Sequence, residues 1–302
     1  MRPKELLTVL EETGPQTGWQ LMERTRLDAL PLWQLIRRTP GVCLETAGTR
    51  FLRLDRGVEG YARLSPSIRR EFLTYTVLGA AARRDAVAAR AELLRREIRR
   101  ISRSKFDLAR ATMATALRSL PRPDAVEERV CFIIAGDIVY DMAHAVPRPE
   151  RSTGRMVRGS DLDIIAIADD ATPPEVLRAL DEAILGRKHY LLFHPRYQEE
   201  IDYVVKNLSR VRTQLAFDSF KSMIAAKILH EGRLLYGSET VFNTVKGMVE
   251  ASGVPGKLRL LERRALESRA EAEAALLRAD PACRDGDFFN LFYTSDEGDE
   301  IY

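Results

Sequence analysis

Two carboxylates stand one residue apart at the head of an apolar run, in the stretch V-R-G-S-D-L-D-I-I-A-I-A-D-D over residues 157–170. In a β-strand, side chains two residues apart point to the same face, so Asp161 and Asp163 share one side of the strand. Like charges at that spacing repel each other, and burial beside apolar residues adds a desolvation cost. A divalent cation removes both objections, because Mg²⁺ binds through carboxylate oxygens. The pattern therefore predicts a magnesium site built on a strand.

The segment G-S-D-L-D-I-I-A-I within this stretch resembles the metal-binding signature of the DNA polymerase beta-like nucleotidyltransferase superfamily. The resemblance covers residues 126–237, much less than the whole chain. It implies a turn and helix that meet a nucleotide triphosphate, an Asp-x-Asp strand, and a third carboxylate from a later strand. It also implies two Mg²⁺ ions, an NTP substrate and transfer of an NMP to a hydroxyl group.

The third carboxylate implied by the resemblance falls in the segment E-E-I-D-Y-V-V at residues 199–205. Glu200 and Asp202 share one face of this predicted strand. We favour Asp202, because its apolar flanks place it inside the sheet, and we keep Glu200 as the second candidate. Either acid could instead form a salt bridge at a strand end. The predicted metal ligands and catalytic residues are Asp161, Asp163 and Asp202.

A buried strand is predicted before the turn, because V-C-F-I-I-A at residues 130–135 is continuously apolar. The resemblance implies a Gly-Ser turn after this strand, at a helix N-terminus where phosphates bind. Here the turn is Gly136-Asp137, so a carboxylate stands where the family has a hydroxyl. Ser160 is an alternative donor, either to the carboxylate of Asp161 or in place of the missing serine. The predicted nucleotide-binding residues are Gly136, Asp137, Ser160, Lys221 and Lys227.

An arginine-rich connection separates this turn from the Asp-x-Asp strand. It carries Arg148, Arg151, Arg155 and Arg158. These side chains could supply cations for phosphates or cover the site. The alternative is a disordered surface insertion.

The N-terminal region has the element order of a winged helix-turn-helix. Helical patterns over residues 4–12, 18–24 and 29–38 precede two short apolar runs that flank a turn at residues 46–49. One interpretation places the third helix in a DNA major groove, with phosphate contacts from Arg37, Arg38 and Arg50. The other interpretation is a protein–protein or packing module.

A long basic helix is predicted over residues 80–120, after a shorter helix over residues 68–78. Its basic side chains run from Arg83 to Arg118, and only a few acidic residues offset them. The helix could guide a nucleic acid backbone. The alternative, which is the commoner one for such charge runs, is a solvated linker helix supported by Arg–Glu pairs one turn apart.

These segments together predict an α+β protein. The predicted parts are a winged helix-turn-helix at residues 1–62, an arginine-rich helical connector at 63–122, a nucleotidyltransferase core with a small mixed sheet at 123–207, and a C-terminal helical region with a mobile acidic tail at 208–302. Within the core, residues 138–145 are predicted as a short helix and residues 190–193 as a possible strand.

The composition is that of an ordinary globular protein, because 45% of the 302 residues are apolar and 30% are charged. A net charge of +3 is too small to identify a polyanionic partner by itself. Cys43, Cys131 and Cys283 are far apart, and we interpret them as reduced thiols, two of them buried. The absence of a long apolar run and of a signal-peptide pattern predicts a cytoplasmic protein without a membrane partner.

The leading hypothesis is a nucleotidyltransferase whose acceptor is nucleic acid, a protein or a small molecule. A toxin–antitoxin enzyme acting on a protein is a related possibility. The alternative of another class is a DNA-binding regulator whose degenerate nucleotidyltransferase fold only senses nucleotide or metal. The Gly136-Asp137 turn is the best argument for that alternative.

Overall fold

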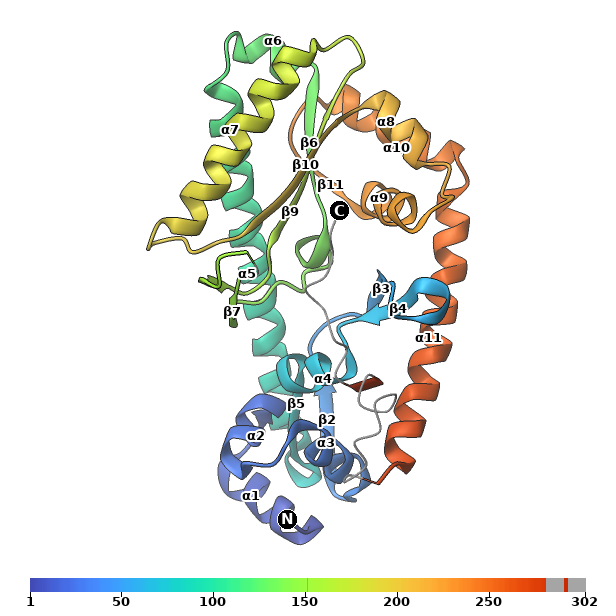
Figure 1. The fold of residues 1–302 in the computed structure, drawn as a ribbon. Coiled ribbons are helices and arrows are strands. Elements are labelled where there is room, and N and C mark those ends of the chain that lie inside the picture. The colour runs from blue at the N-terminus through green and yellow to red at the C-terminus, as the bar shows by residue number, and fades with distance from the viewer. Residues whose placement is uncertain (151, 281–290, 293–302) are drawn as a thin grey trace. The chain divides into compact units, whose positions relative to one another are not determined.

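The computed structural model describes residues 1–150, 152–280 and 291–292, and Figure 1 shows the chain as a ribbon. The fold is mixed α+β with small sheets, as the sequence predicts. The described residues form two compact units, one of residues 1–97 with residues 260–280 and 291–292, the other of residues 98–150 and 152–259. The long helices α5 (Arg84–Arg118) and α11 (Val254–Arg278) each contribute to both units.

The first unit begins with three helices and a three-stranded antiparallel sheet of order β1-β5-β2. A second pair, β3-β4, is inserted between β2 and β5. The elements are α1 Pro3–Thr13, β1 Gln16–Thr17, α2 Gly18–Thr25, α3 Ala29–Arg38, β2 Val42–Thr46, β3 Phe51–Leu54, η1 Glu59–Tyr61, β4 Ala62–Ser65, α4 Ile68–Arg70, η2 Glu71–Tyr75, β5 Thr76–Ala80 and η3 Ala81–Arg83.

Two local predictions in this unit were wrong. The runs around residues 46–49 do not form a hairpin, because β2 pairs with β5 and β3 pairs with β4. Residues 68–78 are not one helix, because residues from Thr76 onward form β5. The central strand buries Val77 and Leu78 completely. At Gly79 an added Cβ would lie 2.4 Å from a methyl carbon of Val87, so close packing against α5 selects glycine there.

The third helix of this unit packs against a segment of the same chain that lies far away in the sequence. The side-chain amide of Gln34 donates to the carbonyl oxygens of Leu276 and Ala279, at 2.6 and 3.1 Å. The guanidinium of Arg38 donates to the carbonyl oxygen of Leu277. Trp33 and Phe292 lie in contact in the same core, with ring centroids 5.9 Å apart. The end of α11 therefore covers part of α3.

Like Arg38, Arg50 was predicted to contact DNA phosphates but is bound by other residues of the same chain. Arg50 forms a two-point ion pair with Glu71 at 2.6 and 2.7 Å, and it reaches Glu273 of α11 at 3.1 Å. The Glu71 carboxylate raises the pKa of Arg50. Arg37 lies 4.0 Å from Glu273. These pairs neutralise the positive charge that a phosphate contact would need.

The second unit is built on a four-stranded mixed sheet of order β10-β9-β6-β11. Strands β10 and β9 are parallel, whereas β6 runs antiparallel to both of its neighbours. The elements are α6 Pro123–Glu127, β6 Val130–Ile134, η4 Gly136–Tyr140, β7 Pro147–Pro149, β8 Met156–Arg158, β9 Leu162–Ala168, α7 Pro174–Phe193, β10 Ile201–Asn207, α8 Leu208–Gln214, α9 Phe220–Glu231, β11 Arg233–Gly237 and α10 Glu239–Ala251.

Helices cover both faces of this sheet, α5 and α7 on one side and α8 to α10 on the other (Figure 1). The first face carries Leu162, Ile164 and Ala166 of β9, which pack with Met113 of α5 and Ile184 of α7. The second face carries the alternate residues of β9, beginning with Asp163. Because both faces are covered, β6 is apolar along its whole length and β9 is apolar apart from Asp163, which is why both strands were recognisable in the sequence.

Two further predictions were wrong in this unit. Residues 190–193 belong to helix α7 rather than to a strand, because Leu191 and Leu192 continue the buried stripe of Ile184. A four-residue apolar run is too short for its periodicity to distinguish helix from strand. The helix after the turn is a single 3₁₀ segment that ends at Tyr140, since Asp141 takes the left-handed conformation, φ 54°.

The two cysteines within the described residues, Cys43 and Cys131, are buried and unpaired, as predicted. Burial raises the pKa of the Cys131 thiol to about 12, so this thiol is protonated and unreactive in the folded protein. Cys283 and the predicted mobile acidic tail lie outside the described residues. Among the described helices, none is both long and apolar enough to cross a membrane.

A buried lysine on β10 predicts a specific pH dependence of stability. Burial, with a contribution from Arg210, lowers the pKa of Lys206 from its usual 10.5 to about 8. Between pH 8 and 10.5 the unfolded chain binds more protons at this group, so stability rises with pH in that window. We expect Lys206→Met to raise the free energy of unfolding at pH 7 by roughly 1–3 kcal/mol and to reduce that rise.

Urea denaturation from pH 7 to 10.5 measures this effect, with the exposed Lys221→Met as the matched control. The control is expected to keep the native slope. A Lys206→Met protein that is less stable than the native chain at pH 7 would contradict the prediction. In that outcome the hydrogen bond from Lys206 to the side chain of Gln214 contributes more than the buried charge costs.

Candidate metal centre

Three carboxylates converge at one end of the four-stranded sheet. Asp163 of β9 lies directly opposite Asp202 of β10 in the parallel pairing, and Asp161 immediately precedes β9. One oxygen from each of the three residues lies within 4.8 Å of the other two. Asp163 is buried, whereas Asp161 and Asp202 are half-buried. The structure thus brings together the three acids that the sequence analysis selected.

The turn after β6 closes this site from a third strand. Its first residue, Gly136, has φ +69°, and a Cβ there would lie only 2.0 Å from an oxygen of Asp163. The amide of Ala135 donates to the backbone carbonyl of Asp163 at 3.0 Å. Glycine is therefore required both by the left-handed backbone and by the closeness of the carboxylate.

Replacing this glycine should displace the buried acid. We expect Gly136→Ala to weaken Mg²⁺ binding at least about tenfold, because the new methyl group occupies the position of the Asp163 carboxylate. Isothermal titration with MgCl₂ measures the change. Gly186→Ala is the matched control, since Gly186 lies on α7 and an added Cβ there meets no atom within 4 Å. Unchanged Mg²⁺ affinity in Gly136→Ala would show that the turn does not shape the site.

Two cations lie against the three carboxylates. Arg148 of β7 reaches Asp161 at 3.6 Å and Glu200 at 2.8 Å. Lys188 of α7 donates to Asp202 at 3.2 Å. These contacts reduce the repulsion that the clustered acids would otherwise experience. Lys188 was not selected from the sequence, because it lies on a helix that carries no motif.

Glu200, the second candidate for the third carboxylate, is buried beside the cluster. Burial and the charges of Asp161 and Asp202 raise the pKa of Glu200, although the guanidinium of Arg148 opposes the rise. Its ion pair with Arg148 fixes the β7–β8 hairpin beside the site. The described contacts thus give Glu200 a partner in the protein, whereas Asp202 is the acid grouped with the Asp-x-Asp pair.

The predicted nucleotide-binding residues fall into two groups. Ser160 and Asp137 lie together beside the carboxylates, since the Ser160 hydroxyl donates to Asp137 at 2.7 Å and accepts from the amide of His144 at 3.2 Å. Ser160 therefore ties the turn after β6 to the start of β9. Lys227 of α9 pairs with Glu231, whereas Lys221 lies exposed in the first turn of the same helix.

The connection with four arginines forms a short antiparallel hairpin of β7 and β8. Arg148 contacts the acidic cluster, and the guanidinium of Arg155 lies 4.6 Å from the ring centre of Phe193. Arg158 is exposed, and Arg151 is outside the described residues. The prediction of a disordered insertion does not hold for the paired strands.

A buried lysine that sequence reasoning missed supports the whole site from α5. The ammonium of Lys105 donates to the carbonyl oxygens of Arg158 and Ser160, both at 2.7 Å, and it forms a buried ion pair with Glu199 at 2.5 Å. Burial lowers the pKa of Lys105 and raises the pKa of Glu199, although each charge favours ionisation of the other. The lysine thus fixes the segments that lead into β9 and β10.

The sequence analysis did not select Lys105 because it is one of many basic residues on α5. Lys105 continues the buried stripe of the helix, in step with Ser102, Ala109 and Met113. A charged residue on the apolar face of an amphipathic helix indicates a buried partner. The helical spacing of Lys105 with these buried residues could therefore have identified it from the sequence.

No family model matches this chain. No curated protein and no solved structure matches it either. The geometry of the acidic cluster therefore carries the functional conclusion by itself.

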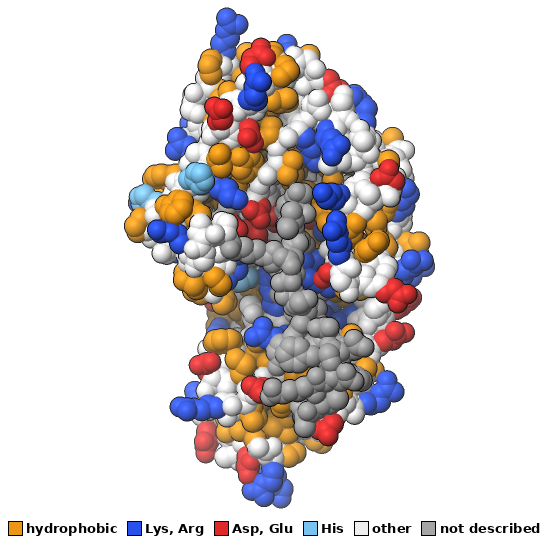
Figure 2. Space-filling view, viewed as in Figure 1, with side chains coloured by type: hydrophobic (Ala, Val, Ile, Leu, Met, Phe, Trp, Pro, Cys, Tyr) orange, Lys and Arg blue, Asp and Glu red, His pale blue; other side chains and the backbone are white. Residues whose placement is uncertain are grey.

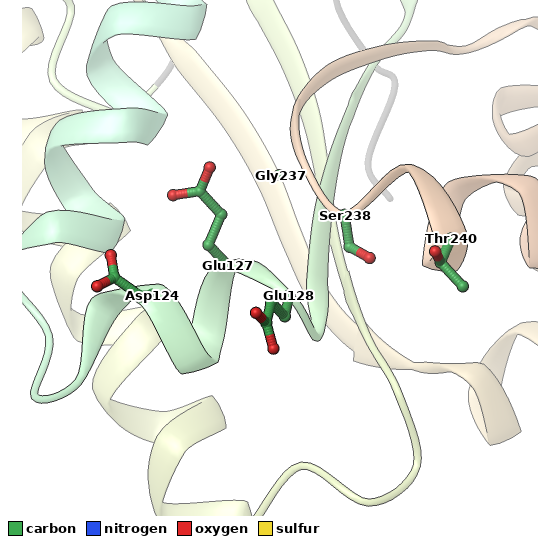
Figure 3. Close-up of a pocket in the computed structure, with 6 residues that line it drawn as sticks. All are labelled: Asp124, Glu127, Glu128, Gly237, Ser238 and Thr240. Carbon is green, nitrogen blue, oxygen red and sulfur yellow. The ribbon is translucent and has the colours of Figure 1, made fainter.

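A hollow of about 550 Å³ lies at the other end of the sheet from the acidic cluster, where β6 begins and β11 ends. Figure 3 shows its lining residues, Asp124, Glu127, Glu128, Gly237, Ser238 and Thr240. Glu127 accepts a hydrogen bond from Tyr236 at 2.7 Å, and Ser238 caps α10. Three carboxylates without a lining cation disfavour a phosphate ligand here. The acidic cluster at the opposite end remains the better candidate site.

Proposed function

We propose that this protein is a nucleotidyltransferase of the polymerase beta-like type, which transfers an NMP from an NTP to a hydroxyl acceptor. The observation that carries the proposal is the convergence of Asp161, Asp163 and Asp202 on one point from two adjacent parallel strands. The mixed sheet, with an Asp-x-Asp strand at its centre and a glycine turn closing the site, also supports it.

The donor set fits magnesium, because all three side chains offer carboxylate oxygens and their oxygens are close enough to share ions. Bound Mg²⁺ would neutralise charge on the triphosphate and activate the attacking hydroxyl group. In this proposal Asp161, Asp163 and Asp202 would hold Mg²⁺, and Asp202 would also accept the proton of the acceptor hydroxyl. The rigid strands supply the geometry that such a site needs.

Two basic side chains beside the carboxylates would bind the triphosphate in the same proposal. Arg148 and Lys188 pair with the carboxylates of the described site, at 3.6 and 3.2 Å. If the three carboxylates held a cation, Lys188 would be available for triphosphate oxygens. Arg148, still paired with Glu200 at 2.8 Å, would offer its remaining N–H groups to the same oxygens. Asp137, which stands in place of a hydroxyl, already holds the hydroxyl of Ser160.

Labelling with [α-³²P]NTPs tests the proposal. The full-length protein is incubated with each NTP, Mg²⁺ and either total cell RNA or total cell protein, and a parallel sample contains EDTA. We expect radiolabel on a macromolecule only in the magnesium sample. No transfer to RNA, protein or water from any of the four NTPs would contradict the proposal.

A DNA-binding regulator with a nucleotide-sensing fold is the second candidate. The N-terminal order of helix, strand, two helices and two sheet strands, which resembles a winged helix, favours it. The contacts of Arg38 and Arg50 with their own chain count against it. Binding to duplex DNA that depends on salt and is unaffected by Asp163→Ala, without any transfer activity, would favour the regulator.

A further inference from the structure

An exposed aromatic surface adjoins the acidic cluster, at the end of α7 and on β8. Tyr190 and Phe193 are each 46% exposed, and Met156 is 51% exposed. The rings of Tyr190, His194 and Tyr197 contact one another at tilts of 42° to 52°, with centroids 5.1 to 5.8 Å apart. We call this set the α7 aromatic patch. Exposed aromatic side chains offer surfaces on which a planar ligand can stack.

Positive charge surrounds the α7 aromatic patch. The guanidinium of Arg155 lies 4.6 Å from the ring centre of Phe193. Residues 183–198 contain Arg187, Lys188 and Arg196 but no acidic residue. Figure 2 shows hydrophobic, histidine and basic side chains side by side over this end of α7. The combination of stacking faces and cations matches the bases and phosphates of a nucleic acid strand.

The hollow within this surface is small. Its volume is about 160 Å³, and its lining is Arg155, Met156, Leu192, Phe193, Pro195 and Gln198. Ligand pockets for whole cofactors have volumes of roughly 300–1,000 Å³. The hollow therefore suits a single base of a longer strand better than a complete small molecule.

The α7 aromatic patch is tied to the metal centre by short connections. Lys188, two residues before Tyr190 on α7, donates to Asp202. The amide of Arg158 on β8 donates to the carbonyl oxygen of Gln198 at 2.8 Å. The chain then enters β10 three residues later. A strand whose bases stack on the patch would thus bring a terminal hydroxyl towards the carboxylates.

We propose that the α7 aromatic patch binds single-stranded nucleic acid, the acceptor in the transfer reaction, through base stacking on Tyr190 and Phe193 and phosphate contacts with the surrounding arginines. This inference rests on the proposed function, because it names the acceptor of that reaction. A paired duplex does not fit, since its bases are already stacked and unavailable to the rings.

Fluorescence anisotropy of the full-length protein tests the inference. The probes are fluorescein-labelled 12-mers of uridine and of thymidine, with a labelled DNA duplex for comparison, in EDTA and without NTP. We expect Tyr190→Ala/Phe193→Ala to weaken binding of the single strands at least about tenfold. Tyr190→Phe keeps a stacking face and should bind normally. Leu185→Ala, an equally exposed site on α7, is the matched control.

Single-strand affinity that is unchanged in Tyr190→Ala/Phe193→Ala would overturn the inference. The inference would also be overturned if Tyr190→Ala/Phe193→Ala bound the single strands normally but no longer retained a protein that co-purifies with the native chain. The surface would then bind a protein partner. Failure of this inference is distinguishable from failure of the proposed function. Binding is measured in EDTA and requires no metal, so binding that depends on Tyr190 and Phe193 would stand even if no transfer were found. Transfer to another acceptor would persist if only the patch were misassigned.

Discussion

Asp163→Asn is expected to reduce nucleotidyl transfer by roughly three orders of magnitude or more, because one neutralised ligand removes several kcal/mol of charge stabilisation from the transition state. Asp163 is the buried member of the acidic cluster, and its oxygen lies within 4.8 Å of oxygens from both other acids. The asparagine keeps the shape of the side chain, so the sheet should be retained. Single-turnover transfer at saturating Mg²⁺ measures the effect.

Asp124→Asn provides the matched control. It makes the same chemical change in the same unit, at an exposed residue in the hollow at the opposite end of the sheet. This variant should transfer at the native rate, and both variants should show native circular dichroism and thermal melting. Transfer by Asp163→Asn within about tenfold of the native rate would exclude the acidic cluster as the catalytic site, since the loss of a carboxylate that holds a catalytic metal costs more than that.

Lys105→Met is expected to lower the free energy of unfolding by about 3–5 kcal/mol, the usual cost of leaving one member of a buried ion pair alone. The lysine loses its bonds to the Arg158 and Ser160 carbonyl oxygens, and Glu199 remains buried without its cation. Because these bonds fix the segments that lead into β9 and β10, transfer should fall as well. Urea denaturation at pH 7 measures the stability.

The double variant Lys105→Met/Glu199→Gln separates charge from packing. With both charges removed, most of the lost stability should return, as is usual when a buried pair is replaced as a unit. Transfer should recover less, because the carbonyl oxygens of Arg158 and Ser160 still lack their donor. If the double variant is no more stable than Lys105→Met, the charge of Glu199 is not the source of the loss.

The sequence by itself was sufficient for the acidic pair. Alternation along a strand put Asp161 and Asp163 on one face, and a continuous apolar run showed that this strand was buried. The resemblance directed attention to a third carboxylate in residues 199–205, and the apolar flanks of Asp202 then favoured it over Glu200. The strand patterns themselves depend only on neighbours in the chain, and local periodicity carries that information.

Only the tertiary structure decided which distant groups meet the site. Register places Asp202 opposite Asp163, and the turn at Gly136 closes on the same carboxylate. Lys105 and Lys188 reach the site from helices whose sequences show no motif. Strand pairing and helix packing join residues far apart in the chain, so no local pattern records them. For the same reason the sequence suggested phosphate contacts for Arg38 and Arg50, whereas the fold pairs them with α11 and Glu71.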